Sequence, residues 1–488
     1  MSCTTLMVGK NASWDGSTLL ARSSDCSLDH WSPKVLTVIH PDSIPHVYRP
    51  PQGKPVIPLP PNPMRYTAAP ETDPARGPMQ DSGINIENVA MSATETINTS
   101  PAVYAADPLI PDSLGERDFV SVVLPFIHSA RDGVRRLGSL LEKYGTSENS
   151  GVAFQDVNEI WYLETLGGHH WFAKRVPDDS YVIAPNMSTI TDFDMADALG
   201  KQSFHMCSAD LPEFIIRSHT LENMSTTELK KCRSLDTHAI LGTRRMLDGI
   251  YNTPRIWFVQ RMLSRRKFRW DGPEADFTPQ SFDFRWALQP DCPIDMEDVK
   301  RVFAAHYEFT DSDPYALAGD AHPHYRPIGI SRSDVTSVTQ IRPYCPEEIR
   351  ALHWIAFGCN MYNSFTPFYA NCSEMPPVFS KADGTVSTDC FYWISRLISA
   401  MADAHYADTC NIIWDYQSGS LKKYLAIIAK RDAEWTSKKP KNSMSFLTKC
   451  NAEISETAHN MTLDLLKRVL DISTHNMICN FDISDVYI

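Results

Sequence analysis

The strongest constraint on the fold is the uneven distribution of strand-like and helix-like sequence along the chain. Roughly the first 190 residues are dominated by short apolar or β-branched runs that turn residues separate, which is typical of strands. Helical periodicity dominates roughly the last 150 residues. This separation favours an α+β fold, in which sheets form a core and helices are added around it.

Several segments of the first part are predicted to be strands. Residues 4–8 and 18–22 flank a turn-rich stretch that contains Asp15-Gly16, so we expect a hairpin there. A third apolar run covers residues 35–39. The remaining strand candidates lie within residues 83–96 and in four later runs, 152–154, 159–164, 171–175 and 181–184, with a hairpin turn at Gly167-Gly168.

Prolines and helical periodicity set the rest of the outline. Residues 50–78 hold ten prolines, too many for a helix or a central strand, and we expect a long surface loop rather than a domain linker. Residues 129–144 carry a helical stripe of Val134, Leu137, Leu140 and Leu141. Later helices are predicted at 346–356, 390–407, 421–435 and 444–472, the last of them either continuous or broken.

Composition excludes several classes of protein. The formal net charge of −13 argues against a general nucleic-acid binder, which needs a basic face. No apolar run is long enough to span a bilayer, and Lys10 and Asp15 interrupt the N-terminus too early for a secretory signal. The twelve cysteines are scattered without a Cys-x-x-Cys pair, which favours a reducing, cytoplasmic location over a disulfide framework.

The N-terminal hairpin carries the first candidate site. End-to-end pairing of its two strands places Thr4 opposite Arg22, with Cys3 beside that pair and Asp25 just beyond the same strand end. A thiol, a guanidinium and a carboxylate at one sheet edge suit nucleophilic attack beside a charge-orienting pair. The alternative is an inert terminal cysteine next to a surface ion pair.

The opening CTTLMVGKNASWDGSTLLARSSD resembles the start of the cysteine dipeptidases of the dipeptidase A type, within the N-terminal-nucleophile (Ntn) hydrolases. Penicillin V acylase and bile-salt hydrolase are relatives, and the secernins are more distant ones. The resemblance covers most of the chain, through INIENVAMSATET, SARDGVRRLGSLLEKYGT, EIWYLETLGGHHWFAKRVPDDSYVIAPN, YNTPRIWFVQRMLS, DPYALAGDAHPHYRPIGISR and SVTQIRPYCPEEIRALHWIAFG.

The resemblance implies that Cys3 becomes the first mature residue, after removal of a two-residue propeptide, Met1-Ser2. Its thiol would attack the amide carbon and form a thioester, while its free α-amine would serve as the base. Both groups titrate near neutral pH, whereas an internal cysteine has an amide nitrogen with no available lone pair. The arginine and aspartate that hold the surroundings of the nucleophile in the superfamily match Arg22 and Asp25.

The resemblance also assigns oxyanion and substrate contacts. One oxyanion-hole asparagine of the superfamily matches Asn186, in VIAPN. The other falls on Glu95, beside Thr94; because an ionised carboxylate cannot donate, either a backbone N–H there replaces it or Glu95 binds the amino group of the substrate. A further superfamily arginine matches Arg255, in TPRIW, whose alternative role is a strand-end ion pair.

The fold implied by the resemblance is the four-layer αββα sandwich of Ntn hydrolases, as one peptidase domain over residues 3–488. We expect a strand-rich core to about residue 340 and a helical elaboration over about 341–488 that covers the sheets and offers a homo-oligomer interface. The implied reaction is dipeptide hydrolysis without a cofactor. The alternatives are a non-peptide amide acylase and a secernin-like interaction protein without turnover.

Histidine pairs raise the question of a metallopeptidase. His169 and His170 would point to opposite faces of a strand, and Pro323 makes the stretch between His322 and His324 loop-like. The sequence has no HExxH motif, so we expect no catalytic metal. Four tryptophans are predicted to be core residues rather than parts of a cofactor site, namely Trp161, Trp171, Trp257 and Trp354.

Overall fold

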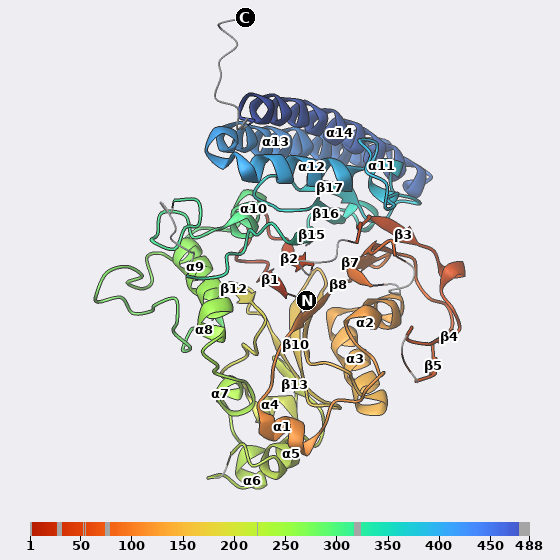
Figure 1. Cartoon of the computed structure of the whole chain (residues 1–488). Coiled ribbons are helices and arrows are strands. Elements are labelled where there is room, and N and C mark those ends of the chain that lie inside the picture. The colour runs from red at the N-terminus through yellow and green to blue at the C-terminus, as the bar shows by residue number, and fades with distance from the viewer. Residues whose placement is uncertain are drawn as a thin grey trace, which may run out of the picture.

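Two antiparallel sheets form the centre of the molecule (Figure 1). The computed structural model describes residues 2–26, 32–51, 53, 55–73, 79–221, 223–316 and 324–477. One sheet has the order β14-β12-β1-β2-β15-β16-β17 and consists of β1 (Ser2–Val8), β2 (Thr18–Asp25), β12 (Tyr181–Ala184), β14 (Ala287–Leu288), β15 (Ser333–Ile341), β16 (Ala351–Phe357) and β17 (Thr366–Tyr369).

The second sheet has the order β13-β11-β10-β9-β8-β7-β6-β3. Its strands are β3 (Thr37–Ile39), β6 (Tyr66–Pro70), β7 (Gln80–Asn85), β8 (Ala90–Thr96), β9 (Ser150–Gln155), β10 (Ile160–Leu166), β11 (His170–Arg175) and β13 (His205–Cys207). A separate short ribbon pairs β4 (Val47–Tyr48) with β5 (Ile57–Pro58). The mixture of these sheets with segregated helices confirms the α+β class.

The helices of the described ranges lie outside the two sheets (Figure 1). None of them is both long and apolar enough to span a membrane. They are α1 (Pro101–Ala106), α2 (Glu116–Val123), α3 (Ala130–Tyr144), α4 (Met195–Ala198), α5 (Leu211–Arg217), α6 (Thr226–Leu229), α7 (Thr237–Leu241), α8 (Asp248–Tyr251), α9 (Thr253–Leu263), α10 (Met296–Ala304), α11 (Pro377–Ser380), α12 (Phe391–Ala404), α13 (Tyr406–Lys438) and α14 (Ser443–His475).

Alternation along β1 explains how the sheets stack. Successive side chains of a strand point to opposite faces. Met7 belongs to the core between the sheets, whereas Leu6 and Val8 pack outward with α9 and α10. α2 and α3 cover the outer face of the other sheet, where Phe119 and Val134 meet the strands. Helices therefore cover both outer faces, and β1 is enclosed on both sides.

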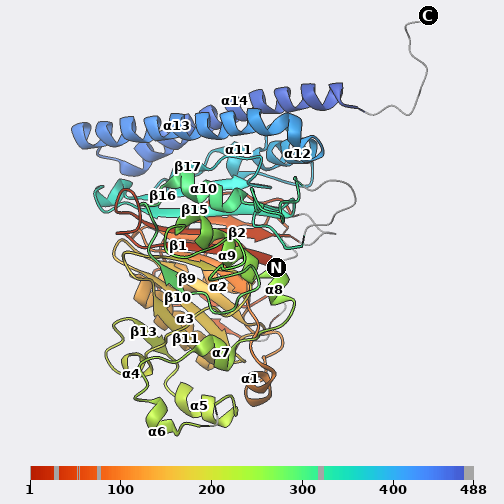
Figure 2. The ribbon, with the colours of Figure 1, turned by 90° about the vertical axis from the view of Figure 1, so that its left-hand side faces the viewer.

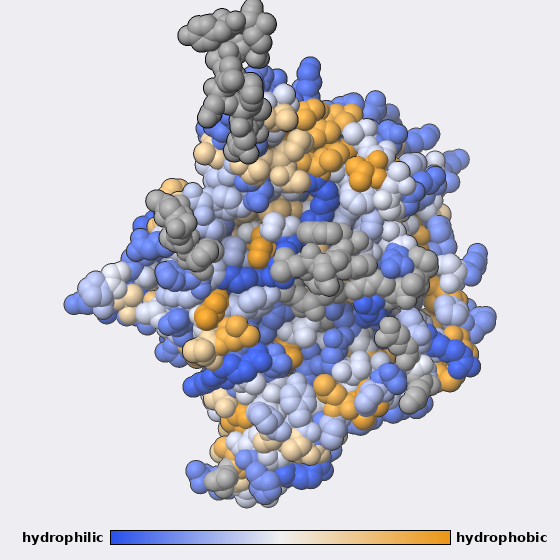
Figure 3. Space-filling view, in the orientation of Figure 1, coloured by the Kyte–Doolittle hydropathy of each residue, from blue (hydrophilic) through white to orange (hydrophobic). Residues whose placement is uncertain are grey.

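The C-terminal helices lie together at one end of the molecule (Figure 2). α12 contacts β16, and α13 and α14 contact β17, the edge strand. The last helix is continuous over Ser443–His475, which is the first of the two alternatives left open by the sequence. These helices carry exposed apolar side chains, among them Trp414 at 54% and Leu425 at 47% exposure, and Figure 3 shows apolar surface over this end.

Two secondary-structure predictions are wrong for identifiable reasons. Residues 346–356 are not a helix but a single 3₁₀ turn, Glu347–Ile349, followed by the strand β16. β16 is buried throughout, so its apolar run lacks the alternation by which a strand is recognised. The proline-rich stretch contains β6, because the residues between Pro63 and Pro70 retain their N–H groups. The four tryptophans predicted to be core residues are buried.

Candidate functional site

Cys3 lies at the start of β1, on the face that looks toward the second sheet. Its side chain is fully buried. The sulfur accepts a hydrogen bond from Nη2 of Arg22 at 2.8 Å, and the backbone N–H donates to Oδ1 of Asn186 at 3.1 Å. Arg22 and Asn186, both predicted from the sequence, thus contact the predicted nucleophile directly.

The register of the hairpin differs from the predicted one by one residue. Thr5, and not Thr4, is opposite Arg22, and Cys3 is opposite Ser24. The difference arises at the turn, because Val8 pairs with Leu19 and not with Thr18, the first residue of the second strand. Since paired residues share a face, Cys3, Thr5 and Arg22 all point between the sheets.

Arg22 sits among charges that the sequence analysis missed. Its Nη1 donates to Oδ1 of Asp81 at 2.9 Å, and its Nη2 also donates to Oε1 of Glu116 at 2.7 Å. Lys34 extends the chain of charges, with Nζ 2.7 Å from Oδ2 of Asp81. All four side chains are buried. Burial alone would lower the pKa of Arg22, but Cys3, Glu116 and Asp81 hold it above its ordinary value.

Burial controls the ionisation of the thiol. It raises the pKa of Cys3 to about 12, although the neighbouring charge of Arg22 acts in the opposite direction. In the chain as described, with Ser2 in front of it, Cys3 therefore carries a neutral thiol and an amide nitrogen. A nearby base is needed to accept the thiol proton.

Asn186 and Arg255 hold the backbone around Cys3. Asn186 lies two residues beyond β12, which pairs with β1. Arg255, in α9, is fully buried and donates to the carbonyl oxygen of Cys3, to Oγ1 of Thr4 at 2.7 Å and to Oδ1 of Asn186 at 3.0 Å. Asn252 accepts from the same guanidinium at 2.7 Å. The spacing of Asn252 and Arg255, three residues along one helix end, is the sequence signal that could have linked them.

Glu95 faces the nucleophile from β8, in the other sheet, and Thr94 precedes it on that strand. Its Oε1 accepts from Oγ1 of Thr5 at 2.6 Å, and its Oε2 lies 3.4 Å from Nδ2 of Asn186. Burial raises the pKa of Glu95 to about 7, even though Arg22 acts to lower it. This carboxyl therefore changes its charge near neutral pH.

Asp25 is separated from the thiol. It stands three residues after Arg22 on β2, so the two side chains point to opposite faces. Its carboxylate accepts hydrogen bonds from Nη2 of Arg326 and, at 3.0 Å, from Oγ of Ser333. Within the described residues, Asp25 thus supports the end of β2, and the partners of Arg22 are Asp81 and Glu116 instead.

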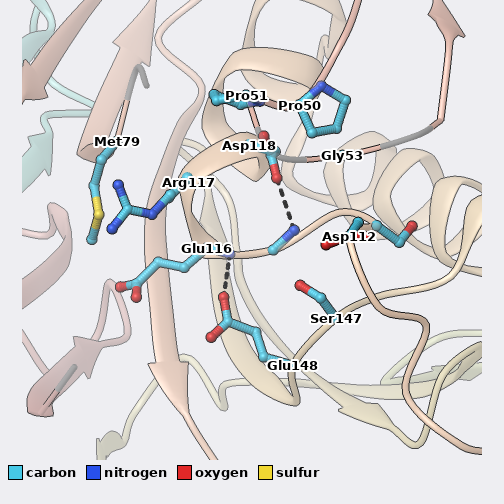
Figure 4. A pocket seen from close by; sticks show the side chains of 12 residues that line it. Pro50, Pro51, Gly53, Met79, Asp112, Glu116, Arg117, Asp118, Ser147 and Glu148 are labelled. Atoms are coloured by element: carbon cyan, nitrogen blue, oxygen red, sulfur yellow. Dashed lines mark hydrogen bonds between the residues drawn. The ribbon is translucent and has the colours of Figure 1, made fainter. Parts of the chain in front are cut away.

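Two cavities adjoin the two ends of this arrangement. One, of about 390 Å³, is lined by Glu116 and neighbouring residues at the start of α2 (Figure 4). The other, of about 320 Å³, is lined by Thr96, Asn98, Asn186, Arg245, Leu247, Asp248, Tyr251 and Asn252. Small-molecule pockets typically have volumes of about 300–1,000 Å³, so each can hold a small polar ligand.

The described residues contain no group of three or more His, Cys, Asp or Glu side chains arranged to hold a metal ion. His169 and His170 both contact Asp107, at 2.9 and 2.7 Å, rather than facing apart, because His169 belongs to the turn before β11. His322 lies outside the described residues. The eleven cysteines in the described ranges are free thiols.

Comparison with known proteins identifies the family of the chain. The model of peptidase family C69 matches residues 2–419. The chain belongs to this family. As a C69 peptidase, it is a hydrolase of peptide bonds, and the matched region begins one residue before Cys3.

Relatives of this C69 peptidase match it over most of its length. A protein named dipeptidase from Bifidobacterium longum is 44% identical over 432 residues, which cover 86% of this chain and 80% of the relative. A probable dipeptidase A from Streptococcus pyogenes serotype M3 is 39% identical and covers 99% of this chain and all of the relative. Dipeptidase A from Lactobacillus helveticus is 36% identical over 99% of both chains.

Proposed function

We propose that this C69 peptidase is a cysteine dipeptidase whose nucleophile is Cys3 after removal of Met1 and Ser2. The observation that carries the proposal is the position of Cys3, whose sulfur and backbone nitrogen contact Arg22 and Asn186 respectively. The relatives named dipeptidase support dipeptides as the substrates, because their similarity extends over nearly the whole chain. A non-peptide acylase or a secernin-like interaction protein is the alternative.

The first half of the reaction forms a thioester. Once residues 1–2 are removed, the nitrogen of Cys3 is an amine, which takes the thiol proton directly or through a water. The sulfur bonds to the carbonyl carbon of the substrate, and the π electrons move onto its oxygen. The C–N bond then breaks, and the departing C-terminal residue takes the proton back from the ammonium of Cys3. Arg22 stabilises the sulfur while it is negatively charged.

Water completes the second half of the reaction. A water molecule gives a proton to the Cys3 amine and attacks the thioester carbon, and the C–S bond breaks. The thiolate then recovers the proton, and the N-terminal residue leaves as a free amino acid. We assign the oxyanion to Nδ2 of Asn186 and to backbone N–H groups near Thr94 and Glu95.

Two of the expected site residues act indirectly in this proposal. Arg255 is fully buried and bonded to Cys3, Thr4 and Asn186, so we assign it to holding the strand end rather than to binding substrate. Asp25 holds the end of β2 through Arg326 and Ser333.

Glu95 is placed to neutralise the α-ammonium of mature Cys3, because it contacts the Asn186 side chain that already binds this nitrogen.

The proposal extends to the domain organisation, the cellular location and the partners of the enzyme. We propose a propeptide of residues 1–2 and a single domain over residues 3–488, with the four-layer αββα architecture of Ntn hydrolases. Free thiols suit a reducing compartment, and we place the enzyme in the cytoplasm. The net charge of −13 disfavours nucleic-acid partners, and the apolar surface of the C-terminal helices supports a homo-oligomer.

N-terminal sequencing combined with activity measurements tests this function. We expect the active protein to begin at Cys3 and to hydrolyse a simple dipeptide such as alanyl-alanine. Cys3→Ala should fold, as judged by circular dichroism and melting temperature, and should have no activity. The proposal is wrong if homogeneous Cys3→Ala protein hydrolyses the dipeptide, or if wild-type protein that retains Met1 and Ser2 is fully active.

A further inference from the structure

The cavity beside Glu116 is lined by negatively charged side chains to which the proposed reaction gives no role. It is formed by the residues before and within the first turn of α2, by the turn before β9, and by residues near β4 and β7 (Figure 4). Four of its lining residues are acidic and one is basic, namely Asp112, Glu116, Asp118, Glu148 and Arg117. The cavity is therefore suited to a cation.

The carboxylates of this cavity are held in place by the backbone. Oε1 of Glu148 accepts from the N–H of Glu116 at 2.7 Å, and Oδ2 of Asp118 accepts from the N–H of Gly115 at 2.9 Å (Figure 4). Burial raises the pKa of both Glu116 and Asp118, and the nearby charge of Glu148 raises them further. A bound cation would relieve this repulsion.

The cavity is linked to the nucleophile through Arg22, which contacts both Glu116 and Cys3. Nη2 of Arg22 donates to the sulfur of Cys3 at 2.8 Å and to the carboxylate of Glu116 at 2.7 Å. Glu116 therefore lines the cavity and also contacts the guanidinium that is bonded to the thiol. In a dipeptide, the carbon that the sulfur attacks is bonded to the Cα that carries the free α-ammonium. That ammonium must consequently lie close to the sulfur during acylation.

We infer that this cavity binds the α-ammonium of the N-terminal residue of the substrate, with Glu148 and Glu116 as its acceptors. The inference rests on the proposed function and specifies the orientation of the dipeptide. A metal ion is the less suitable occupant, because the described residues contain no group of three or more His, Cys, Asp or Glu side chains arranged to hold one. Arg255, for which the resemblance implied a substrate contact, is instead bonded within the protein.

The test compares Glu148→Gln with a matched control. Glutamine keeps an oxygen that can accept from the N–H of Glu116 and removes only the charge. Glu142→Gln is the control, because Glu142 also accepts one N–H, from Nε1 of Trp171 at 2.9 Å, and lies outside the cavity. The substrates are alanyl-alanine and N-acetyl-alanyl-alanine. Each is measured with wild type and both variants, and melting temperatures confirm folding.

We expect Glu148→Gln to lower kcat/KM for alanyl-alanine by about tenfold, through KM, because a charge-assisted contact is lost. Its kcat/KM for the acetylated substrate should be unchanged, so that the preference for a free amino terminus shrinks. Glu142→Gln should keep the wild-type preference. If Glu148→Gln does not fold, Asp112→Asn removes another negative charge from the cavity lining and should shrink the same preference, since asparagine tolerates the positive φ of 61° at that position.

The inference is overturned if the folded Glu148→Gln variant retains the full wild-type preference for the free amino terminus. Equal losses on both substrates would also overturn it, because they would indicate a structural role. Failure of the proposed function is a separate outcome, since it is detected by activity of Cys3→Ala. An inactive Cys3→Ala protein together with an unchanged preference in Glu148→Gln refutes only the ammonium site.

Discussion

One nitrogen of Arg22, Nη2, lies 2.8 Å from the sulfur of Cys3. The guanidinium comes from the neighbouring strand and is itself fixed by Asp81 and Glu116, so the contact does not depend on a flexible loop. A buried thiol with a pKa of about 12 needs such a cation when it ionises. The pair is thus the central electrostatic element of the proposed site.

The first prediction concerns this guanidinium. Arg22→Lys keeps the charge but not the fork that contacts Cys3, Asp81 and Glu116 together. We expect kcat/KM to fall by about ten- to a hundredfold, because at least one charge-assisted contact is lost. The matched control is Arg261→Lys, whose partner Asp271 is exposed. Wild-type kcat/KM in Arg22→Lys would contradict a role in stabilising the sulfur.

The second prediction concerns metal independence. Activity should survive prolonged treatment with a strong chelator and should be lost on alkylation by iodoacetamide, with the label on Cys3 by mass spectrometry. Cys292 is an exposed thiol, and Cys292→Ser should be inactivated at the same rate as wild type. Chelator inactivation that added zinc reverses would instead indicate a metallopeptidase.

The third prediction concerns the pH dependence of Glu95. Its pKa is raised to about 7, so it is neutral below that pH and ionised above it. If the ionised form holds the α-ammonium of Cys3, kcat/KM rises as the pH increases through about 7. Glu95→Gln should lose this rise and retain only the titration of the α-amine, whose ordinary pKa is about 7.7–8.0.

The control for this experiment is Glu87→Gln, which alters an exposed carboxylate paired with His128. Its pH profile should match that of the wild type. An unchanged rise near pH 7 in Glu95→Gln would assign the titration to another group and remove Glu95 from the mechanism.

The fourth prediction concerns stability at acidic pH. His353 is fully buried between the sheets, with its ring nitrogens 2.9 Å from Oγ1 of Thr67 and 2.7 Å from Oγ of Ser337. Burial lowers its pKa to about 3 from 6.5. Between these values the unfolded chain binds a proton that the folded chain does not, so this residue makes the fold less stable as the pH falls below about 6.5.

Melting temperatures between pH 7 and pH 4.5 measure this effect. His353→Gln can keep a hydrogen bond to a hydroxyl but cannot bind the proton, so its melting temperature should fall less over this range than that of the wild type. Parallel curves for the two proteins would show that His353 does not carry the acid sensitivity.

The sequence predicted best those parts of the molecule that depend on local periodicity. The bounds of β12 match residues 181–184, and α3 begins one residue after the predicted start. The error at residues 346–356 has a physical cause, since a strand buried on both faces shows no alternation. The strand β6 was missed because proline content was averaged over a window wider than a strand.

The sequence predicted those site residues that come from neighbouring strands of one sheet. Cys3, Arg22 and Asn186 do lie together, because the neighbouring strands β12, β1 and β2 bring them to the same end of the sheet. Asp81 and Glu116 come from the second sheet and its covering helix, and only the packing of two sheets places them beside Arg22. Such contacts leave no spacing that a single sequence can reveal.

The central position of β1 has a consequence for how the enzyme becomes active. β12 begins to pair with this strand at Thr5, and among the described residues Ser2 contributes one rung to the ladder, opposite Asp25. In the proposed maturation the new terminus would therefore stay on a paired strand, with Asn186 and Arg255 bonded to Cys3. Because the proposed base exists only after this cut, we expect an uncut chain, even one with both sheets assembled, to be unable to hydrolyse peptides.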